Sequence, residues 1–214
     1  MGVTLKLATS LDGRIATATG ESRWITGPEA RAEVHRLRAA HDAVLVGVET
    51  ALADDPELTV RLDGYAGRQP ARVVLDSRQR IPLTAKLVQT ALTVPTYILC
   101  TTPPSESLIA AGVRVLQVEP VGDGRPDLAA TLAALAAEDL ERVMVEGGGQ
   151  AAASFLRCGL VDRIEWFRAP LLLGAEGRPA VGELGLDALA AAPRFRRVFV
   201  QEVGEDLWEH YERV

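Results

Sequence analysis

Short segments that are apolar along nearly their whole length recur through this chain, and they constrain its fold more than any other feature. Strands that are apolar on both faces are typical of a parallel sheet covered on both sides. Segments with helical spacing of apolar residues separate several of them, and this alternation predicts an α/β fold: a three-layer, mostly parallel sheet flanked by helices. The expected strands are Asp42 to Gly47, Arg72 to Leu75, Thr96 to Cys100, Val113 to Val118, Arg142 to Val145 and Ile164 to Phe167, and the expected helices are Ser105 to Ala111, Leu128 to Ala137 and Ala151 to Leu160.

The two ends of the chain add a strand, a helix and a hairpin. Val3 to Thr9 reads as a strand, and a helix starting near Pro28, with Thr26 as its cap, should run to about Ala40. Near the C-terminus, 194–203 and 207–213 alternate polar and apolar residues around Gly204, which predicts an antiparallel hairpin at the sheet edge. No linker is long enough to divide the chain, so we expect a single domain over residues 1–214.

Composition excludes several classes of function. The net charge of −6 over 214 residues argues against broad nucleic-acid binding, which needs a basic face. No apolar run approaches the ~18 residues of a membrane-spanning helix, and no leader segment is evident. Cys100 and Cys158 should be two buried free thiols in a reducing compartment, and the three histidines lack metal-ligand spacing. We therefore expect a cytoplasmic protein without a metal.

A run of glycines follows one of the apolar strands. Glu146 ends the strand, and Gly147, Gly148 and Gly149 lead into a helix-like segment. Glycine lets the backbone approach an anion, and a helix N-terminus offers free N–H donors, so the pattern predicts an anion site. The alternative is a flexible turn. Glu146 should lie at the carboxyl end of its strand, where ligands of open α/β sheets bind, or else be a solvated glutamate.

Charged and aromatic side chains elsewhere are candidates for ligand contacts. Lys6 lies inside an apolar strand, an expensive place for an ammonium group, with Ala8 on the same face; the alternative is a lysine that reaches solvent from the strand end. Arg38 and Arg61 can clamp a phosphate, or can be surface ion pairs. Trp24 fits either core packing or a lid over a planar ring.

Taken in order, these segments resemble a known family. KLATSLDGRIA, SRWIT, VLVGVETALADDPELTVR, PARVVLDS, VEGGG and LVDRIEWFRAPLLLG are similar to the reductase half of the bacterial bifunctional riboflavin-biosynthesis deaminase–reductase, over nearly the whole chain. The resemblance implies a dihydrofolate-reductase-like fold. It also implies NADPH-dependent reduction of the ribose of 5-amino-6-(5-phosphoribosylamino)uracil to a ribityl chain, with hydride delivered to C1′ of the ring-opened sugar.

The resemblance also implies roles for particular residues. Lys6, Asp54 and Glu146 would serve catalysis, with Lys6 steadying the opened sugar or passing a proton. The substrate would be bound by Ser22, Arg38, Leu58, Arg61 and Glu146. The cofactor would be bound by Ala8, Trp24, Thr50, Asp54, Ser77, Gly148, Gly149, Gln150, Ala151, Ala152, Ala153 and Ser154. From charge alone, Arg78 and Arg80 are candidates for the 2′-phosphate of NADPH.

The chain departs from the full bifunctional family in one respect. It lacks the H-x-E and P-C-x-x-C elements of the zinc deaminase half, so we expect no deamination. Other substrates stay open: the non-deaminated diaminopyrimidinone, or a pterin such as dihydrofolate. A non-catalytic ligand-binding relative is the alternative of another class. The family tends to form homodimers, and Ile164 to Leu173 could supply an apolar interface or simply sheet core.

Overall fold

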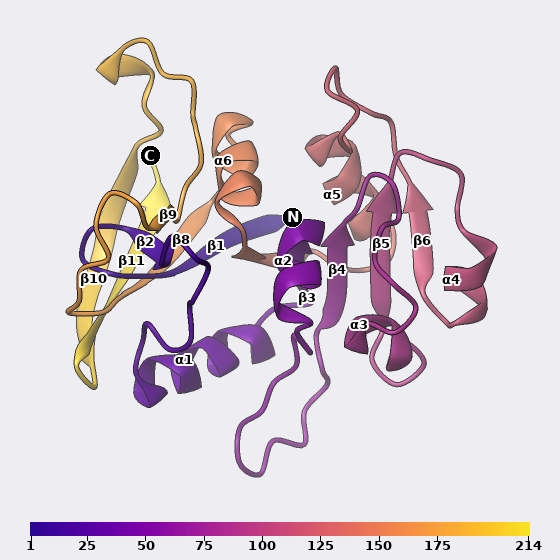
Figure 1. Cartoon of the computed structure of the whole chain (residues 1–214), viewed down its shortest axis with the longest axis horizontal. Coiled ribbons are helices and arrows are strands. Elements are labelled where there is room, and N and C mark those ends of the chain that lie inside the picture. The colour runs from indigo at the N-terminus through magenta and orange to yellow at the C-terminus, as the bar shows by residue number, and fades with distance from the viewer. The chain divides into compact units, whose positions relative to one another are not determined.

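A computed structural model describes residues 1–214 (Figure 1). The chain divides into two compact units. The first unit comprises Met1 and His35–Gly147, and the second comprises Gly2–Val34 and Gly148–Val214. One division therefore falls within helix α1 (Pro28–Ala39), after Val34, and the other falls between Gly147 and Gly148. The prediction of a single domain stays a prediction.

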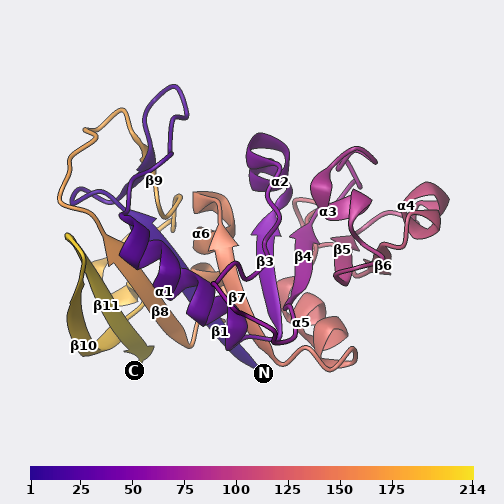
Figure 2. The ribbon, with the colours of Figure 1, turned by 90° about the horizontal axis from the view of Figure 1, so that it is seen from below.

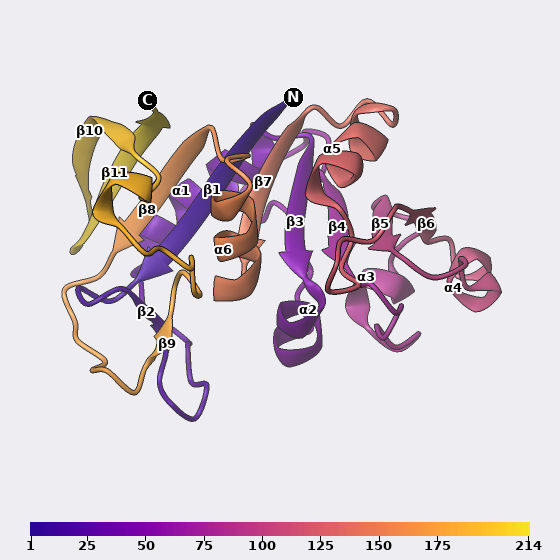
Figure 3. The ribbon, with the colours of Figure 1, turned by 90° about the horizontal axis from the view of Figure 1, so that it is seen from above.

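The first unit holds five strands in the order β7-β3-β4-β5-β6. Each paired neighbour is parallel. In Figures 2 and 3, helix α5 lies on one face of these strands and α3 on the other, which gives three layers. The elements are β3 (Ala43–Gly47), α2 (Val48–Asp54), β4 (Ala71–Leu75), α3 (Lys86–Gln89), β5 (Thr96–Cys100), α4 (Glu106–Ala110), β6 (Arg114–Gln117), α5 (Leu128–Ala136) and β7 (Arg142–Gly147).

The apolar strands of this unit form its core, as their composition predicts. Val44 and Val46 of β3, Val74 of β4 and Ile98 of β5 are at most 1% exposed, and they pack in one hydrophobic cluster. Burial of such side chains, each worth about 1.5–3 kcal/mol, is what drives these short segments together. Because these strands are parallel, their carboxyl ends share one edge of the sheet, where the connecting loops can carry ligand-binding residues.

The second unit has four strands in the order β10-β11-β8-β1. Strand β8 (Arg163–Arg168) is parallel to β1 (Gly2–Thr9), whereas β11 (Asp206–Arg213) is antiparallel to both β8 and β10 (Phe195–Val203). Strands β2 (Arg14–Ala16) and β9 (Arg178–Pro179) pair separately. Helix α6 (Gly149–Arg157) lies on one face of this unit's sheet in Figure 3, and a 3₁₀ turn covers Leu189–Ala191.

The predicted fold class is confirmed: the strands are mostly parallel, helices flank them, and an antiparallel hairpin closes the C-terminal end. Helices α2 and α3 and strands β2 and β9 were not predicted, because each is seven residues or shorter and its partners lie elsewhere in the chain. Cys100 and Cys158 are both free, but Cys158 is exposed, so the prediction of two buried thiols is wrong for it. No helix is long and apolar enough to span a membrane.

Candidate active site

A buried ion pair at the end of β7 forms the centre of the candidate site in the first unit. The Arg38 Nε and Nη2 groups donate to Glu146 Oε1 and Oε2 at 2.6 and 2.8 Å. The two side chains are only 11% and 7% exposed. Arg38 is in the last turn of α1 and Glu146 is near the end of β7, so 108 residues of chain separate two side chains that meet in one bidentate pair.

The guanidinium of Arg38 stays charged in this pair. Burial alone would lower the pKa of the Arg38 guanidinium, but the charge of Glu146 and its hydrogen bonds outweigh burial and raise that pKa above its usual value. The Arg38 Nη1 group also donates to Thr59 O at 2.8 Å. A guanidinium has five N–H groups, and these three bonds leave two for a ligand. The predicted roles of Arg38 and Glu146 therefore stay available, but Arg38 also holds Glu146 in place.

The segment after α2 carries the other predicted substrate residues. Leu58 has a left-handed backbone, with φ of 53°, and its side chain is 4% exposed. The Arg61 side chain, in contrast, is 52% exposed, and its Nη1 lies 3.4 Å from Glu57 Oε2. Such a long, exposed contact contributes little, so the Arg61 guanidinium can exchange Glu57 for a stronger anion such as phosphate.

The predicted cofactor residues of the first unit lie on α2 and after β4. Thr50 is partly buried on α2, and Asp54 is its exposed last residue. Ser77 follows β4, and its carbonyl accepts from both Thr101 N and Thr101 Oγ1. Arg80 Nη2 already donates to Glu49 Oε1 at 2.5 Å, whereas Arg78 is exposed. Of the two arginines named for the 2′-phosphate, Arg78 is the better placed to take a new anion.

In the second unit, Lys6 and Ala8 are partly buried while Leu5 and Leu7 are 1% and 6% exposed. The alternation predicted for β1 is confirmed. Lys6 stands in register with Glu165 of β8, which is 6% exposed. Glu165 accepts from Trp208 Nε1 at 2.6 Å and from His210 Nδ1 at 2.7 Å. Sequence reasoning missed Glu165, because a single glutamate inside a strand gives no signal of its partners.

The residues before α1 are mostly open to solvent. Trp24 is 66% exposed, so the core-packing alternative for it is wrong. The Arg31 guanidinium lies 4.5 Å from the centre of its ring, a cation–π distance. Ser22 is partly buried. An exposed ring near a cationic group fits the alternative of a lid, which stays a prediction.

The three glycines are favoured for two different reasons. A side chain at Gly147 would have its Cβ 2.9 Å from Thr50 Cγ2. Gly148 has a positive φ of 78°, a backbone conformation that residues other than glycine rarely adopt. A Cβ at Gly149 would lie 2.6 Å from Pro179 O. Chain packing therefore explains two of these glycines without a ligand.

The turn also opens a helix whose N-terminus suits an anion. The first helical bond of α6 is donated by Ala152 N–H to Gly148 O. The N–H groups of Gly149, Gln150 and Ala151 therefore have no place in the helical ladder. No acidic residue lies in the first turn to occupy them, so the turn fits the diphosphate of a nicotinamide cofactor.

The comparisons with known proteins agree with this arrangement. The family model described as the RibD C-terminal domain matches residues 2–208. The chain belongs to this family. It is 39% identical to the riboflavin biosynthesis protein RibD of Aquifex aeolicus, over 99% of this chain and 57% of that protein. The chain thus spans just over half the length of that relative.

Two further relatives complete the comparison. The chain is 39% identical to a 2,5-diamino-6-ribosylamino-4(3H)-pyrimidinone 5′-phosphate reductase of Methanothermobacter thermautotrophicus, over 98% of this chain and 96% of that protein. A solved structure of Acinetobacter baumannii RibD superposes with a TM-score of 0.86 at 34% identity, and it covers 100% of this chain and 58% of its own. The predicted resemblance and fold are therefore confirmed.

Proposed function

We propose that this chain is an NADPH-dependent reductase that converts the ribose of a phosphoribosylaminopyrimidine into a ribityl chain. The deaminated compound, 5-amino-6-(5-phosphoribosylamino)uracil, is the substrate expected from the family. The observation that carries the proposal is the buried, ionised Arg38–Glu146 pair beside the exposed Arg61. A carboxylate fixed by a bidentate partner can accept hydrogen bonds from ligand hydroxyl or amino groups, and a guanidinium held only loosely can bind the substrate phosphate.

The reaction needs few protein groups. When bound, NADPH would supply the hydride for C1′ of the ring-opened imine, and the imine nitrogen would need a proton from the protein. Lys6 is the protein's candidate donor of that proton, because it is the cation placed within β1. Glu146 orients the substrate, and Asp54 is a second candidate for proton movement. Orientation of the reacting carbon is the main contribution expected of the protein.

The cofactor proposal rests on the turn that opens α6. Its residues Gly148, Gly149, Gln150 and Ala151 present backbone N–H groups suited to a diphosphate, and Arg78 is the candidate partner of the 2′-phosphate that distinguishes NADPH from NADH. Ala8, Trp24, Thr50, Ser77 and the residues Ala152 to Ser154 remain the other proposed cofactor contacts.

A second substrate is favoured by one comparison. The Methanothermobacter thermautotrophicus protein matches over almost its whole length, and it is named for the non-deaminated 2,5-diamino compound. A reductase of about the same length as this chain is thus named for the compound that still carries the second amino group. We therefore propose the non-deaminated compound as the alternative substrate.

The proposal extends to the assembly and location of the chain. We propose a cytoplasmic homodimer. Within Ile164 to Leu173, the strand residues Ile164 and Phe167 are 9% and 0% exposed and belong to the core, whereas Leu172 is 70% exposed. Only the end of this run is thus open to an interface. Sedimentation of the purified chain measures the assembly state.

The decisive experiment measures NADPH oxidation with the deaminated compound, its non-deaminated precursor and dihydrofolate in parallel. We expect turnover with one of the first two compounds and none with dihydrofolate, which lacks a phosphate for Arg61. Lys6→Met should abolish turnover at saturating substrate while leaving NADPH binding intact. Near-normal turnover by Lys6→Met would remove Lys6 from the mechanism, and inactivity of the wild-type chain toward all three compounds would contradict the proposed function.

A further inference from the structure

Three consecutive residues, Thr59 to Arg61, have their backbone held by side chains from elsewhere in the first unit. Gln69 Oε1 accepts from Val60 N at 2.7 Å, and Gln69 Nε2 donates to Val60 O at 3.1 Å. His35 Nδ1 accepts from Arg61 N at 3.2 Å. With the bond from Arg38 to Thr59 O, side chains satisfy four backbone groups in a segment that belongs to no helix or strand.

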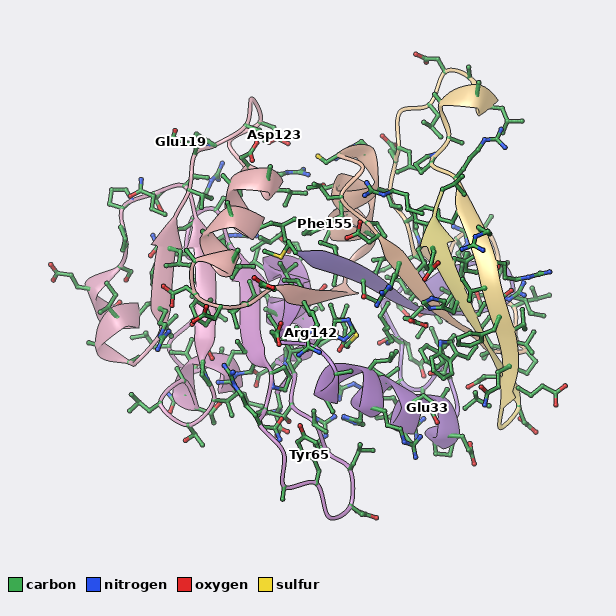
Figure 4. The ribbon with its side chains drawn as sticks, turned by 180° about the vertical axis from the view of Figure 1, so that it is seen from behind. Glu33, Tyr65, Glu119, Asp123, Arg142 and Phe155 are labelled. Atoms are coloured by element: carbon green, nitrogen blue, oxygen red, sulfur yellow. The ribbon has the colours of Figure 1, made fainter.

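The sources of these side chains are separate parts of the sequence. His35 and Arg38 are three residues apart on α1, and therefore lie on one side of that helix. Gln69 is at the end of the loop that follows Arg61; this loop projects from the unit, with Tyr65 near its tip (Figure 4). The path of the Arg61 backbone is thus fixed from two directions, although the Arg61 side chain is half exposed.

The surroundings of His35 keep its acceptor available. Burial, together with the nearby positive charges of Arg38 and Arg61, lowers the pKa of the imidazole from 6.5 to about 4, against the opposing charge of Glu146. The ring is therefore neutral at neutral pH. Because Nδ1 accepts the Arg61 N–H, the ring proton resides on Nε2.

We propose that His35 and Gln69 are positioning residues of the substrate site, which hold the backbone of Val60 and Arg61 so that the Arg61 guanidinium is presented to the substrate phosphate. The inference rests on the proposed function, because it takes Arg61 as a phosphate ligand. A guanidinium recognises an oxyanion through directed pairs of N–H groups, so its affinity depends on where its backbone is fixed. Neither His35 nor Gln69 need touch the substrate.

The test measures binding of ribose 5-phosphate by calorimetry, with ribose as the phosphate-free control. Arg61→Ala should weaken binding about tenfold to hundredfold, as expected for loss of a hydrogen bond between charged groups. His35→Leu and Gln69→Leu should each weaken it about threefold to tenfold. His35→Asn keeps an acceptor near the position of Nδ1 and should restore most of the affinity. His41→Leu is the matched control: His41 lies just after α1, its Nδ1 is 2.6 Å from Leu37 O, and its replacement should leave affinity unchanged.

A double-mutant cycle separates positioning from general destabilisation. If His35 and Gln69 act through Arg61, then His35→Leu and Gln69→Leu lose their effect once Arg61 is alanine. Full additivity, or unchanged affinity in both single variants while Arg61→Ala weakens binding, would overturn the inference and leave the proposed function standing. Failure of the wild-type chain to bind ribose 5-phosphate would overturn the phosphate-binding part of the proposed function instead. If His35→Leu does not fold, the Gln69→Leu cycle and the His35→Asn rescue decide the question.

Discussion

Arg38 and Arg72 are both buried in the first unit, at 9% and 1% exposure, yet they have opposite environments. Arg38 faces the carboxylate of Glu146. Arg72 donates its hydrogen bonds to neutral oxygens: to Thr90 Oγ1 at 2.7 Å, to Thr96 Oγ1 at 2.6 Å, and to two backbone carbonyls, Leu87 O and Val94 O. Burial lowers the pKa of Arg72 to about 10, whereas the pKa of Arg38 is raised.

The difference separates support of the fold from support of a site. Arg72 joins β4 to the chain between α3 and β5, and its Nε is buried without a partner. Its hydrogen bonds therefore support the fold and do not orient a charged side chain. Arg38 donates its hydrogen bonds to the carboxylate of Glu146 at a strand end and to the backbone oxygen of Thr59. A buried arginine is therefore informative about function only through the group that it contacts.

The largest expected effect is that of Arg38→Met. It leaves Glu146 buried without its charged partner, which should lower the free energy of unfolding by about 3–5 kcal/mol. It should also lower kcat/KM about a hundredfold, because Glu146 loses its orientation. Urea unfolding and steady-state kinetics measure the two losses. Arg38→Lys keeps the charge without the bidentate geometry and should recover stability better than activity. Normal kinetics in Arg38→Met would break the comparison.

Arg72→Met should have the second largest effect, and it should lower the stability of the fold without lowering activity. Removing the guanidinium leaves buried carbonyls and hydroxyls without donors, at a cost of about 2–4 kcal/mol. Turnover per folded molecule should stay near the wild-type value, which active-site titration combined with urea unfolding can establish. A large loss of turnover in the folded fraction would show that Arg72 also serves the site.

A titratable neighbour, His35, should give the Arg38 region a dependence on pH. The pKa of His35 is lowered from 6.5 to about 4. Between these values the unfolded chain binds the proton and the folded chain does not, so His35 should reduce stability as pH falls from 6.5 toward 4. His35→Asn lacks this contribution. Thermal melts of both proteins across that window should show wild type losing stability faster, and parallel curves would contradict the assignment.

An exposed arginine should give the smallest effect. Arg142, labelled in Figure 4, donates to Asp42 at 2.7 and 3.2 Å, in a geometry much like that of Arg38, but its side chain is 63% exposed. Solvent weakens such a pair, so Arg142→Ala should cost less than about 1 kcal/mol in urea unfolding. A cost equal to that of Arg38→Met would mean that bidentate geometry, and not burial, determines how much such a pair contributes to stability.

The sequence predicts the strands well and the contacts between distant segments poorly. Asp42 to Gly47 and Thr96 to Cys100 are apolar runs whose burial follows directly from their composition. The pairing of Arg38 with Glu146 spans 108 residues, and spacing along the chain contains no information about it. Both residues were predicted to bind substrate, but their contact was not. His35 gave no metal-ligand spacing, and Gln69 lay in a loop without a motif, so neither was a candidate.

The three consecutive glycines have a consequence for attempts to change the cofactor preference proposed for this chain. A Cβ at Gly149 would lie 2.6 Å from the backbone oxygen of Pro179, a Cβ at Gly147 would press on the Thr50 side chain at 2.9 Å, and Gly148 needs a positive φ that other residues resist. Substitutions at Gly148 and Gly149 should therefore destabilise this turn. Arg78 is exposed and is the better position to vary, whereas its neighbours Asp76 and Gln79 hold the local backbone by accepting from Ile81 N and Ser105 N.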